Sequence, residues 1–144
     1  GVIPKTKAER EKFFKNFKDM NVTGIFYESP HRLLKTLKSL YSQFGNINVC
    51  VCRELTKLFE EYKRGCIDEI ISYYEEKGVK GEIVLVIEKI VDEKETFDVV
   101  NEIFKLKKEG YSNKDIVKTL KDNFNISKNE AYELVLNFEN KEAN

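Results

Sequence analysis

Five consecutive residues, Glu28, Ser29, Pro30, His31 and Arg32, form the most chemistry-bearing stretch of the chain. An apolar run ends there and a helical pattern begins at once, so Ser29 is expected as the N-cap and Pro30 as the first helical residue. His31 and Arg32 then fall in the first helical turn, where the helix dipole disfavours positive charge. Either a bound anion or the neighbouring Glu28 would compensate that charge.

Two further polar clusters lie at the ends of other strand patterns. Residues 53–57, Arg-Glu-Leu-Thr-Lys, follow an apolar run, and residues 80–82, Lys-Gly-Glu, precede another. Ligands of open α/β sheets collect at strand ends, so neighbouring strands would place some of these clusters along one crevice. The residues alone leave open whether they bind a ligand or form ordinary ion pairs.

Self-contained catalytic and metal-binding motifs are missing from the sequence. It contains no G-x-S-x-G, no H-E-x-x-H and no G-x-x-x-x-G-K-[ST], and it lacks the glycine-rich turn of a nucleotide-binding α/β domain. One histidine and a C-x-C pair do not make a usual zinc set, so no metal is expected. We interpret Cys50, Cys52 and Cys66 as buried free thiols.

The composition indicates a soluble globular protein. The 144 residues are 41% hydrophobic and 35% charged, and no apolar run approaches the ~20 residues that cross a bilayer. No signal peptide heads the chain, so a cytoplasmic location without membrane contact is expected. The net charge is zero, but residues 5–38 carry nine Lys/Arg against four Asp/Glu. This basic region either faces phosphate or is a solvated, lysine-rich helix face.

Helical and strand patterns alternate over the first ninety or so residues. The periodicity predicts helices at 6–20, 30–44 and 67–76, and strands at 22–27, 47–53, 60–65 and 83–87. The first strand is mostly apolar and is expected to be buried on both faces, and the third is expected at an edge. This alternation predicts an α/β fold with mostly parallel pairing.

A charged linker at 91–96 is followed by three helical patterns, at 97–109, 113–123 and 128–140. We therefore expect two domains, 1–92 and 93–144. The expected small helical core consists of Phe104, Ile116, Leu120, Ile126, Ala131, Leu134 and Val135. Such a unit invites a helix-turn-helix interpretation, but its last helix offers few cations for phosphate. DNA is therefore not an expected partner, and a packing or RNA-positioning role is preferred.

Three segments together resemble one protein family. Residues 26–33, 53–58 with Glu60 and Glu61, and 80–88 are similar in order and spacing to the ribosomal RNA small-subunit methyltransferase I family, within the tetrapyrrole-methylase-like superfamily. The resemblance covers the whole chain. It implies the second α/β domain of that fold, a mixed sheet flanked by helices, with a small C-terminal three-helix appendage.

The same resemblance implies an activity. Family members use S-adenosylmethionine to methylate the ribose 2′-hydroxyl of a cytidine in 16S rRNA, with the methyl donor in a cleft between two α/β domains. The first of those domains has no counterpart here, so the chain alone is expected neither to bind the cofactor tightly nor to transfer a methyl group. The small ribosomal subunit and a second copy of the protein are the expected partners.

The resemblance also implies roles for individual residues. Relatives use a Tyr-Met-Gly against S-adenosylmethionine where this chain has Tyr27, Glu28 and Ser29, and a Pro-Ala-Leu near the adenine where it has Gly81, Glu82 and Ile83. These two segments are the expected cofactor-binding residues, the first through its backbone. Because the side chains differ from those of the relatives, their own roles stay open.

The remaining polar residues of the clusters are candidates for RNA contact and proton transfer. Arg32, Arg53 and Lys57 are expected to bind RNA phosphate or to organise the target ribose. His31 or Glu54 is expected to assist deprotonation of the 2′-hydroxyl. Two other interpretations stay open: a non-catalytic RNA-binding or dimerisation module, and a tetrapyrrole-type methylase relative that acts on a small molecule.

Overall fold

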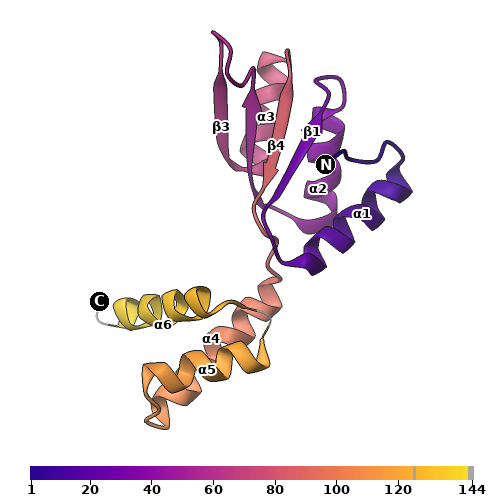
Figure 1. Ribbon diagram of the computed structural model, residues 1–144. Helices are drawn as coiled ribbons and strands as arrows, with labels where there is room; N and C mark the ends of the chain where they lie inside the picture. Colours follow the sequence, from indigo (N-terminus) through magenta and orange to yellow (C-terminus); the bar gives the residue numbers. More distant parts are fainter. Residues whose placement is uncertain (125, 143–144) are drawn as a thin grey trace. The chain divides into compact units, whose positions relative to one another are not determined.

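Residues 1–124 and 126–142 are described by the computed structural model, except for the side chains of residues 93 and 94. The chain divides into two compact units, Gly1–Ile90 and Val91–Asn144. The first unit contains, in chain order, α1 (Lys7–Met20), β1 (Gly24–Glu28), α2 (Leu33–Phe44), β2 (Asn48–Arg53), β3 (Glu61–Cys66), α3 (Ile67–Lys77) and β4 (Ile83–Ile87) (Figure 1). The predicted α/β class is confirmed.

The four strands form one sheet in the order β1-β4-β2-β3, and each neighbouring pair is antiparallel. The predicted mostly parallel pairing, and with it a mixed four-stranded sheet, is therefore wrong. Strands joined through a helix, β1 with β2 and β3 with β4, do run in the same direction. They are not neighbours, however, because β4 lies between β1 and β2, and β2 lies between β3 and β4. The alternation of helices and strands predicts strand direction but not adjacency.

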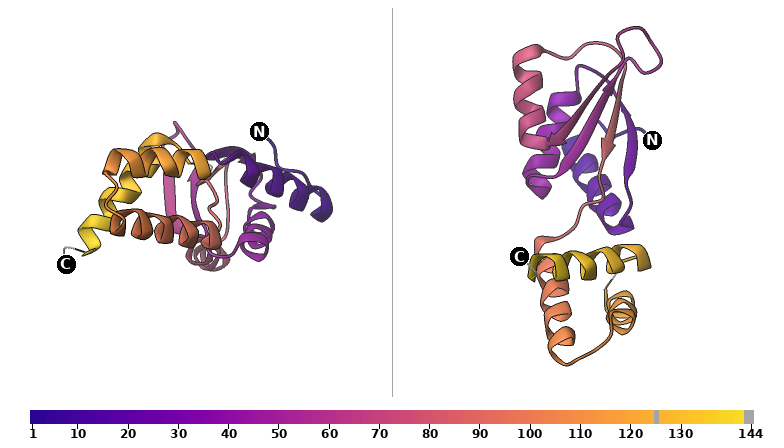
Figure 2. Two further views of the ribbon diagram at one scale, coloured as in Figure 1. Left: turned by 90° about the horizontal axis from the view of Figure 1, so that it is seen from below. Right: turned by 90° about the vertical axis from the view of Figure 1, so that its left-hand side faces the viewer.

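The two faces of the sheet differ in their cover. Helices α1, α2 and α3 lie on one face, where Phe14, Leu37 and Ile70 pack with Leu85 of the central strand β4 (Figure 2). On the other face Ile25 and Tyr27 of β1 are 63% and 68% exposed. Burial on both faces of the first strand was thus a wrong prediction: alternate residues of β1 face the helices, and the others face away from them.

The start of α2 also differs from the prediction. The helix begins at Leu33. The residues before it, Pro30 to Arg32, form a turn in which the backbone N–H groups of Arg32 and Leu33 both donate to the Ser29 carbonyl at 3.1 Å. His31 and Arg32 thus lie just before the helix rather than within its first turn. The Ser29 hydroxyl accepts from Arg32 Nε at 3.3 Å.

The second unit is helical, with α4 (Glu93–Lys108), α5 (Asn113–Asn123) and α6 (Lys128–Glu142). Helix α4 starts inside the segment predicted as a charged linker, whose acidic residues also suit a first helical turn. Phe104 is 54% exposed, so its prediction as a core residue is wrong. The buried core consists of Val99, Ile103, Leu106, Ile116, Val117, Leu120, Ala131 and Val135.

The Leu85→Ala substitution is expected to lower the free energy of unfolding of the first unit by about 2–5 kcal/mol, because it leaves a cavity beneath the sheet. Ile25→Ala on the open face is the matched control and should cost about 1 kcal/mol at most. Urea denaturation followed by circular dichroism measures both. Equal losses would contradict the assignment of the buried and open faces.

Candidate functional site

The antiparallel sheet brings the three predicted polar clusters to one edge. Glu28, at the end of β1, is opposite Ile83, at the start of β4. Ile83 is in turn opposite Arg53, at the end of β2, and Arg53 is opposite Glu61, at the start of β3. These four residues therefore form a row across the sheet. The prediction that neighbouring strands would place the clusters together is confirmed, although through antiparallel pairing.

A crevice of about 510 Å³ opens at this edge. Ligand sites of proteins commonly have volumes of about 300–1,000 Å³. The crevice is lined by all six residues expected to bind the cofactor: Tyr27, Glu28, Ser29, Gly81, Glu82 and Ile83. Pro30, Leu55 and Val84 complete the lining. Two segments from neighbouring strands thus line one concave surface.

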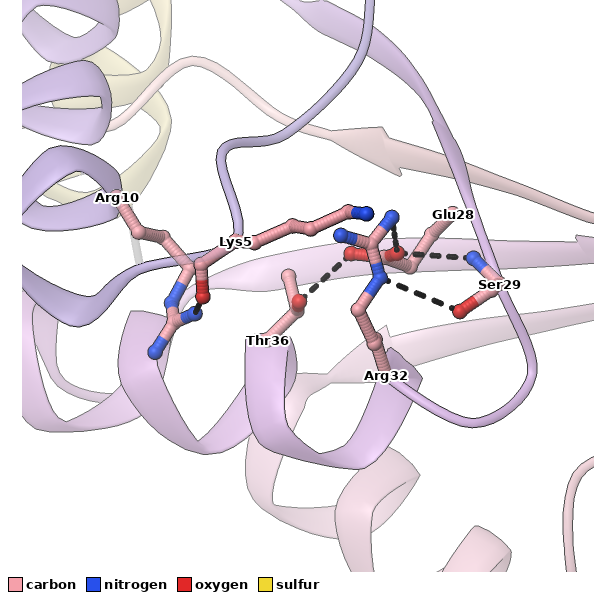
Figure 3. Close-up of polar contacts among 6 residues, drawn as sticks. All are labelled: Lys5, Arg10, Glu28, Ser29, Arg32 and Thr36. Atoms are coloured by element: carbon pink, nitrogen blue, oxygen red, sulfur yellow. Dashed lines mark hydrogen bonds and ion pairs between the residues drawn. The ribbon is translucent and has the colours of Figure 1, made fainter.

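Glu28 directs its carboxylate away from solvent, into a network with the turn and α2 (Figure 3). Its Oε1 accepts from Ser29 N–H at 2.8 Å and pairs with Arg32 Nη2 at 3.1 Å, and its Oε2 accepts from the Thr36 hydroxyl at 2.7 Å. Charge-assisted bonds of this kind are stronger than neutral ones and fix the local backbone. Glu28 therefore compensates Arg32, which was one of the two explanations offered by the sequence.

Glu54 fastens the loop after β2 to the segment before β4. Its backbone N–H donates to the Glu82 carbonyl at 3.0 Å, and its Oε1 accepts from Glu82 N–H at 3.0 Å. Lys57 Nζ lies 2.9 Å from Glu54 Oε2 and 3.0 Å from Glu82 Oε2. We call these three residues the clasp. The bond from Lys57, with that from Glu82 N–H, holds the pKa of Glu54 below its usual value, and the two carboxylates raise the pKa of Lys57.

The clasp needs backbone conformations that few side chains tolerate. Glu54 has a φ of 52°, Thr56 of 66° and Gly81 of 86°. A Cβ on Gly81 would stand 1.9 Å from Glu54 Oε1. Glycine at position 81 therefore provides both the positive φ and the space for the Glu54 carboxylate.

Arg53 holds the same segment from its other side. Its guanidinium donates to the Lys80 carbonyl and pairs with Glu61 Oε2 at 2.9 Å. The hydrogen bond to Glu61 is the main cause of the raised pKa of Arg53. Tyr73 donates its hydroxyl proton to Glu61 Oε1 at 3.2 Å, so α3 is tied into the same network. The segment 80–82 is thus fixed at one end by Arg53 and at the other by Glu54.

The three cations predicted to contact RNA are all paired with carboxylates: Arg32 with Glu28, Arg53 with Glu61, and Lys57 with Glu54 and Glu82. His31 is exposed and lines a different hollow, between α1 and α2. Glu54 does not line that hollow and is instead bonded to the crevice residue Glu82, so the structure does not bring the two candidate bases together. The predicted RNA-binding and catalytic roles of these residues stay predictions.

Some contributing residues were not identified from the sequence. Thr36 lies a helical turn inside α2 and reads as an ordinary helix residue, although it donates to buried Glu28. Leu55 lines the crevice from within a polar cluster. The contact of Thr36 with Glu28 and the position of Leu55 beside the start of β4 both depend on the tertiary fold. No local sequence signal therefore identifies either residue.

Cys50, Cys52 and Cys66 are free, as predicted. Cys52 is buried, whereas the other two are half-buried, so burial of all three was overestimated. Cys50 and Cys52 share one strand face with their Sγ atoms 3.8 Å apart, and burial raises the pKa of the Cys52 thiol to about 11. Over residues 1–124 and 126–142, no group of three or more metal-ligating side chains occurs, and no helix is long and apolar enough to span a bilayer.

Comparison with known proteins supports the resemblance. No family model matches the chain. Curated proteins named Ribosomal RNA small subunit methyltransferase I are similar over nearly all of it. The protein of Rickettsia prowazekii is 38% identical over 94% of this chain and 49% of its own length. Those of Bacillus subtilis and Streptococcus pyogenes serotype M3 are each 34% identical over 92% of this chain and 48% of their own length. The predicted resemblance to this family is confirmed. The chain spans about half the length of these relatives, which is consistent with a C-terminal portion.

Substitution of Gly81 by alanine tests the space beneath the clasp. Gly78 also has a positive φ, 76°, but a Cβ there would meet no atom within 4 Å. Gly78→Ala should therefore cost about 1–2 kcal/mol of unfolding free energy from backbone strain alone. Gly81→Ala should cost about 1–2 kcal/mol more, because it also displaces Glu54 from its hydrogen bonds. Denaturation of both variants measures the difference, and equal costs would contradict the clasp.

The clasp should also respond to acid. The pKa of Glu54 is lower in the folded protein than in the unfolded chain. Ionisation of Glu54 therefore stabilises the clasp fully at pH values above the ordinary glutamate pKa of about 4.3. That contribution is lost as the pH falls through the lower folded pKa. The Glu82 amide resonance should therefore shift in an NMR titration with a midpoint below about pH 4.3, and Glu54→Gln should abolish the transition. A midpoint at or above that pH would show that Glu54 is not held by Lys57 and Glu82.

Proposed function

We propose that this chain is the C-terminal part of an S-adenosylmethionine-dependent methyltransferase that methylates the 2′-hydroxyl of a cytidine ribose in 16S rRNA. The observation that carries the proposal is the crevice, which is lined by all six residues that the resemblance implies for cofactor binding. The similarity to rRNA methyltransferases over nearly the whole chain supports the substrate class. A cytoplasmic location follows from this proposal.

The crevice would hold the methyl donor mainly through backbone groups. The side chain of Glu28 is turned into the protein, and the N–H groups of Tyr27 and Ser29 donate to the Gly1 carbonyl and to Glu28 Oε1. Residues 27–29 therefore offer a ligand backbone carbonyl oxygens, which have two lone pairs each, and the exposed Tyr27 ring. On the neighbouring segment Gly81 and Ile83 line the crevice, with the space beside the Gly81 Cα taken by the Glu54 carboxylate. A backbone-lined, partly apolar wall suits a nucleoside, whose base has polar edges and an apolar face.

The chain supplies only part of this site in the proposal. Tyr27 and Ile25 are exposed on a sheet face that no element of the first unit covers. In a protein of the relatives' length, a further domain would provide the opposite wall. We therefore expect the 144-residue chain alone to show no saturable S-adenosylmethionine binding by calorimetry and no methyl transfer.

A positioning role for Glu54 fits its contacts better than a role as general base. Both of its carboxylate oxygens accept hydrogen bonds, and its lowered pKa makes it a weak proton acceptor. Removal of the 2′-hydroxyl proton would then depend chiefly on the alignment of the hydroxyl with the sulfonium. His31 remains the second candidate base, without a contact to the crevice that supports it.

The homodimer is part of the proposal as well. Leu58 and Phe59, at the tip of the loop between β2 and β3, are 89% and 76% exposed, and exposed apolar side chains of this size are common at subunit interfaces. Light scattering of the protein extended to the relatives' length should give twice the mass of one chain. A monomer at all concentrations would remove the dimer from the proposal.

A pair of tyrosines on the open sheet face tests the crevice. Tyr27→Ala, in the protein extended to the relatives' length, should raise the Kd for S-adenosylhomocysteine about tenfold, because one wall of the crevice loses its ring. Tyr62 is similarly exposed on β3 but does not line the crevice, so Tyr62→Ala should change the Kd less than about twofold. Calorimetry measures both, and equal effects would contradict the placement of the cofactor.

The reaction itself is tested on 30S subunits that lack the modification. Incubation with methyl-labelled S-adenosylmethionine and the extended protein should place one label on a cytidine ribose of 16S rRNA, identified by mass spectrometry of nuclease fragments. A label on a base, or on no RNA, would refute the proposed reaction.

A further inference from the structure

The first unit has a second hollow, which is positively charged and shares no lining residue with the crevice. It has a volume of about 680 Å³ and lies between α1 and α2, away from the crevice. Its charged or titratable lining residues are Lys7, Arg10, Glu11, His31, Lys35 and Lys38. Four cations against one carboxylate give it a net positive charge with His31 neutral.

Arg10 is the central residue of this hollow. It is only 4% exposed, yet the acceptors of its guanidinium are neutral. Nε donates to the Ser39 hydroxyl at 3.0 Å, and Nη1 donates to the Lys5 carbonyl at 3.0 Å, the latter drawn in Figure 3. No carboxylate of the part of the chain that the structure describes forms an ion pair with it. A guanidinium is always charged, and a buried charge without a counter-ion is costly. The charge of Arg10 is therefore buried without a paired carboxylate.

The surrounding cations could add to such a site at little cost. Lys35 forms no ion pair with any residue that the structure describes. Lys7 lies 3.9 Å from Glu11, and Lys38 lies 2.6 Å from Glu75, but both pairs are exposed. Exposed pairs contribute little to stability, so an incoming anion can replace them. The first turns of α1, which hold Lys7 and Arg10, also present the positive end of the helix dipole.

We propose that the hollow between α1 and α2 binds a phosphodiester of RNA, with Arg10 as the central phosphate ligand and Lys35 as an exposed second contact. The choice of RNA rests on the proposed function, whereas the choice of phosphate rests on the charge and geometry alone. A guanidinium can bind phosphate through two parallel hydrogen bonds. Several lysines spread over the hollow suit a ligand with several phosphates better than a small acid with a single charge. Arg32, Arg53 and Lys57 are already paired with carboxylates, so this hollow offers the better phosphate contacts.

Binding of a fluorescein-labelled single-stranded RNA to the 144-residue chain, followed by anisotropy, tests the inference. Lys35→Glu should weaken binding at least fivefold. Lys77→Glu, the same charge change at an exposed position in the last turn of α3, should change it less than twofold. Lys35→Ala should reduce the slope of log K against log salt by about 0.7, the value for one phosphate contact to a single strand. Equal effects of the two Glu variants, or no RNA binding, would overturn the proposal.

Two further measurements keep the ligand class testable. The Arg10 Nε–Hε resonance of the wild-type chain should shift on addition of the RNA, which avoids substitution of a buried residue. If inorganic phosphate shifts it and RNA does not, the hollow is a site for an adventitious ion only and the inference fails. It also fails if vesicles of anionic phospholipid compete successfully with RNA in a manner that depends on Lys35.

Failure of this inference is distinguishable from failure of the proposed function. If the extended wild-type and Lys35→Glu proteins methylate 16S rRNA equally well, the reaction stands and the hollow is not a substrate contact. If neither methylates RNA but the chain binds RNA through Lys35, the phosphate site stands without the reaction.

Discussion

Two hydrogen bonds between Glu54 and Glu82 determine the shape of the crevice more than any other contact. They join backbone to backbone and side chain to backbone, so the loop after β2 and the segment before β4 form one rigid wall. Glycine at position 81 is required beneath them, and Lys57 neutralises the carboxylate that makes the second bond. Without these contacts the segment before β4 would be held, among the residues that the structure describes, only by the bond from Arg53 to the Lys80 carbonyl. A preorganised wall binds a ligand at a lower entropic cost than a loop that must order on binding.

The order of the strands explains why such a wall can form at all. In a parallel sheet of consecutive strands, the start of β4 would lie at the opposite edge from the ends of β1 and β2. Here β4 is inserted between them in the reverse direction, so its first residue is paired with the last residues of both neighbours. One face of the sheet carries no helix of the first unit (Figure 2). Tyr27, which lines the crevice, is exposed on that face. A site shared with a further domain follows naturally from this arrangement.

The sequence was sufficient for the elements but not for their arrangement. Helical periodicity predicted α1, α2 and α3, with glycine stops at the ends of α2 and α3, and apolar or β-branched runs predicted β1, β2 and β4. These are local properties of the chain. Strand adjacency depends on contacts between residues far apart in sequence, and it was wrongly predicted from the helix–strand alternation. The grouping of Tyr27 with Gly81 was anticipated through the resemblance, and the structure places both in one crevice.

The side-chain partners were hardest to predict. For Arg32, Arg53 and Lys57 the sequence left open whether they bind a ligand or form ion pairs, and the structure pairs all three with carboxylates. From the sequence, Arg10 was one of several cations on a lysine-rich helix face. Its burial and its neutral hydrogen-bond acceptors, which the structure shows, set it apart from the exposed lysines. Charge counts along a sequence report which residues are charged, whereas compensation depends on tertiary contacts.

We propose that the crevice is one wall of a cofactor site and that a further domain completes this site. A crystal structure of the protein extended to the relatives' length, with S-adenosylhomocysteine bound, tests it most directly. The account predicts that the ligand contacts the backbone of residues 27–29 and of residues 81–83, with the Glu54–Glu82 hydrogen bonds intact. A ligand held entirely by the added domain, without contact to either segment, would contradict it.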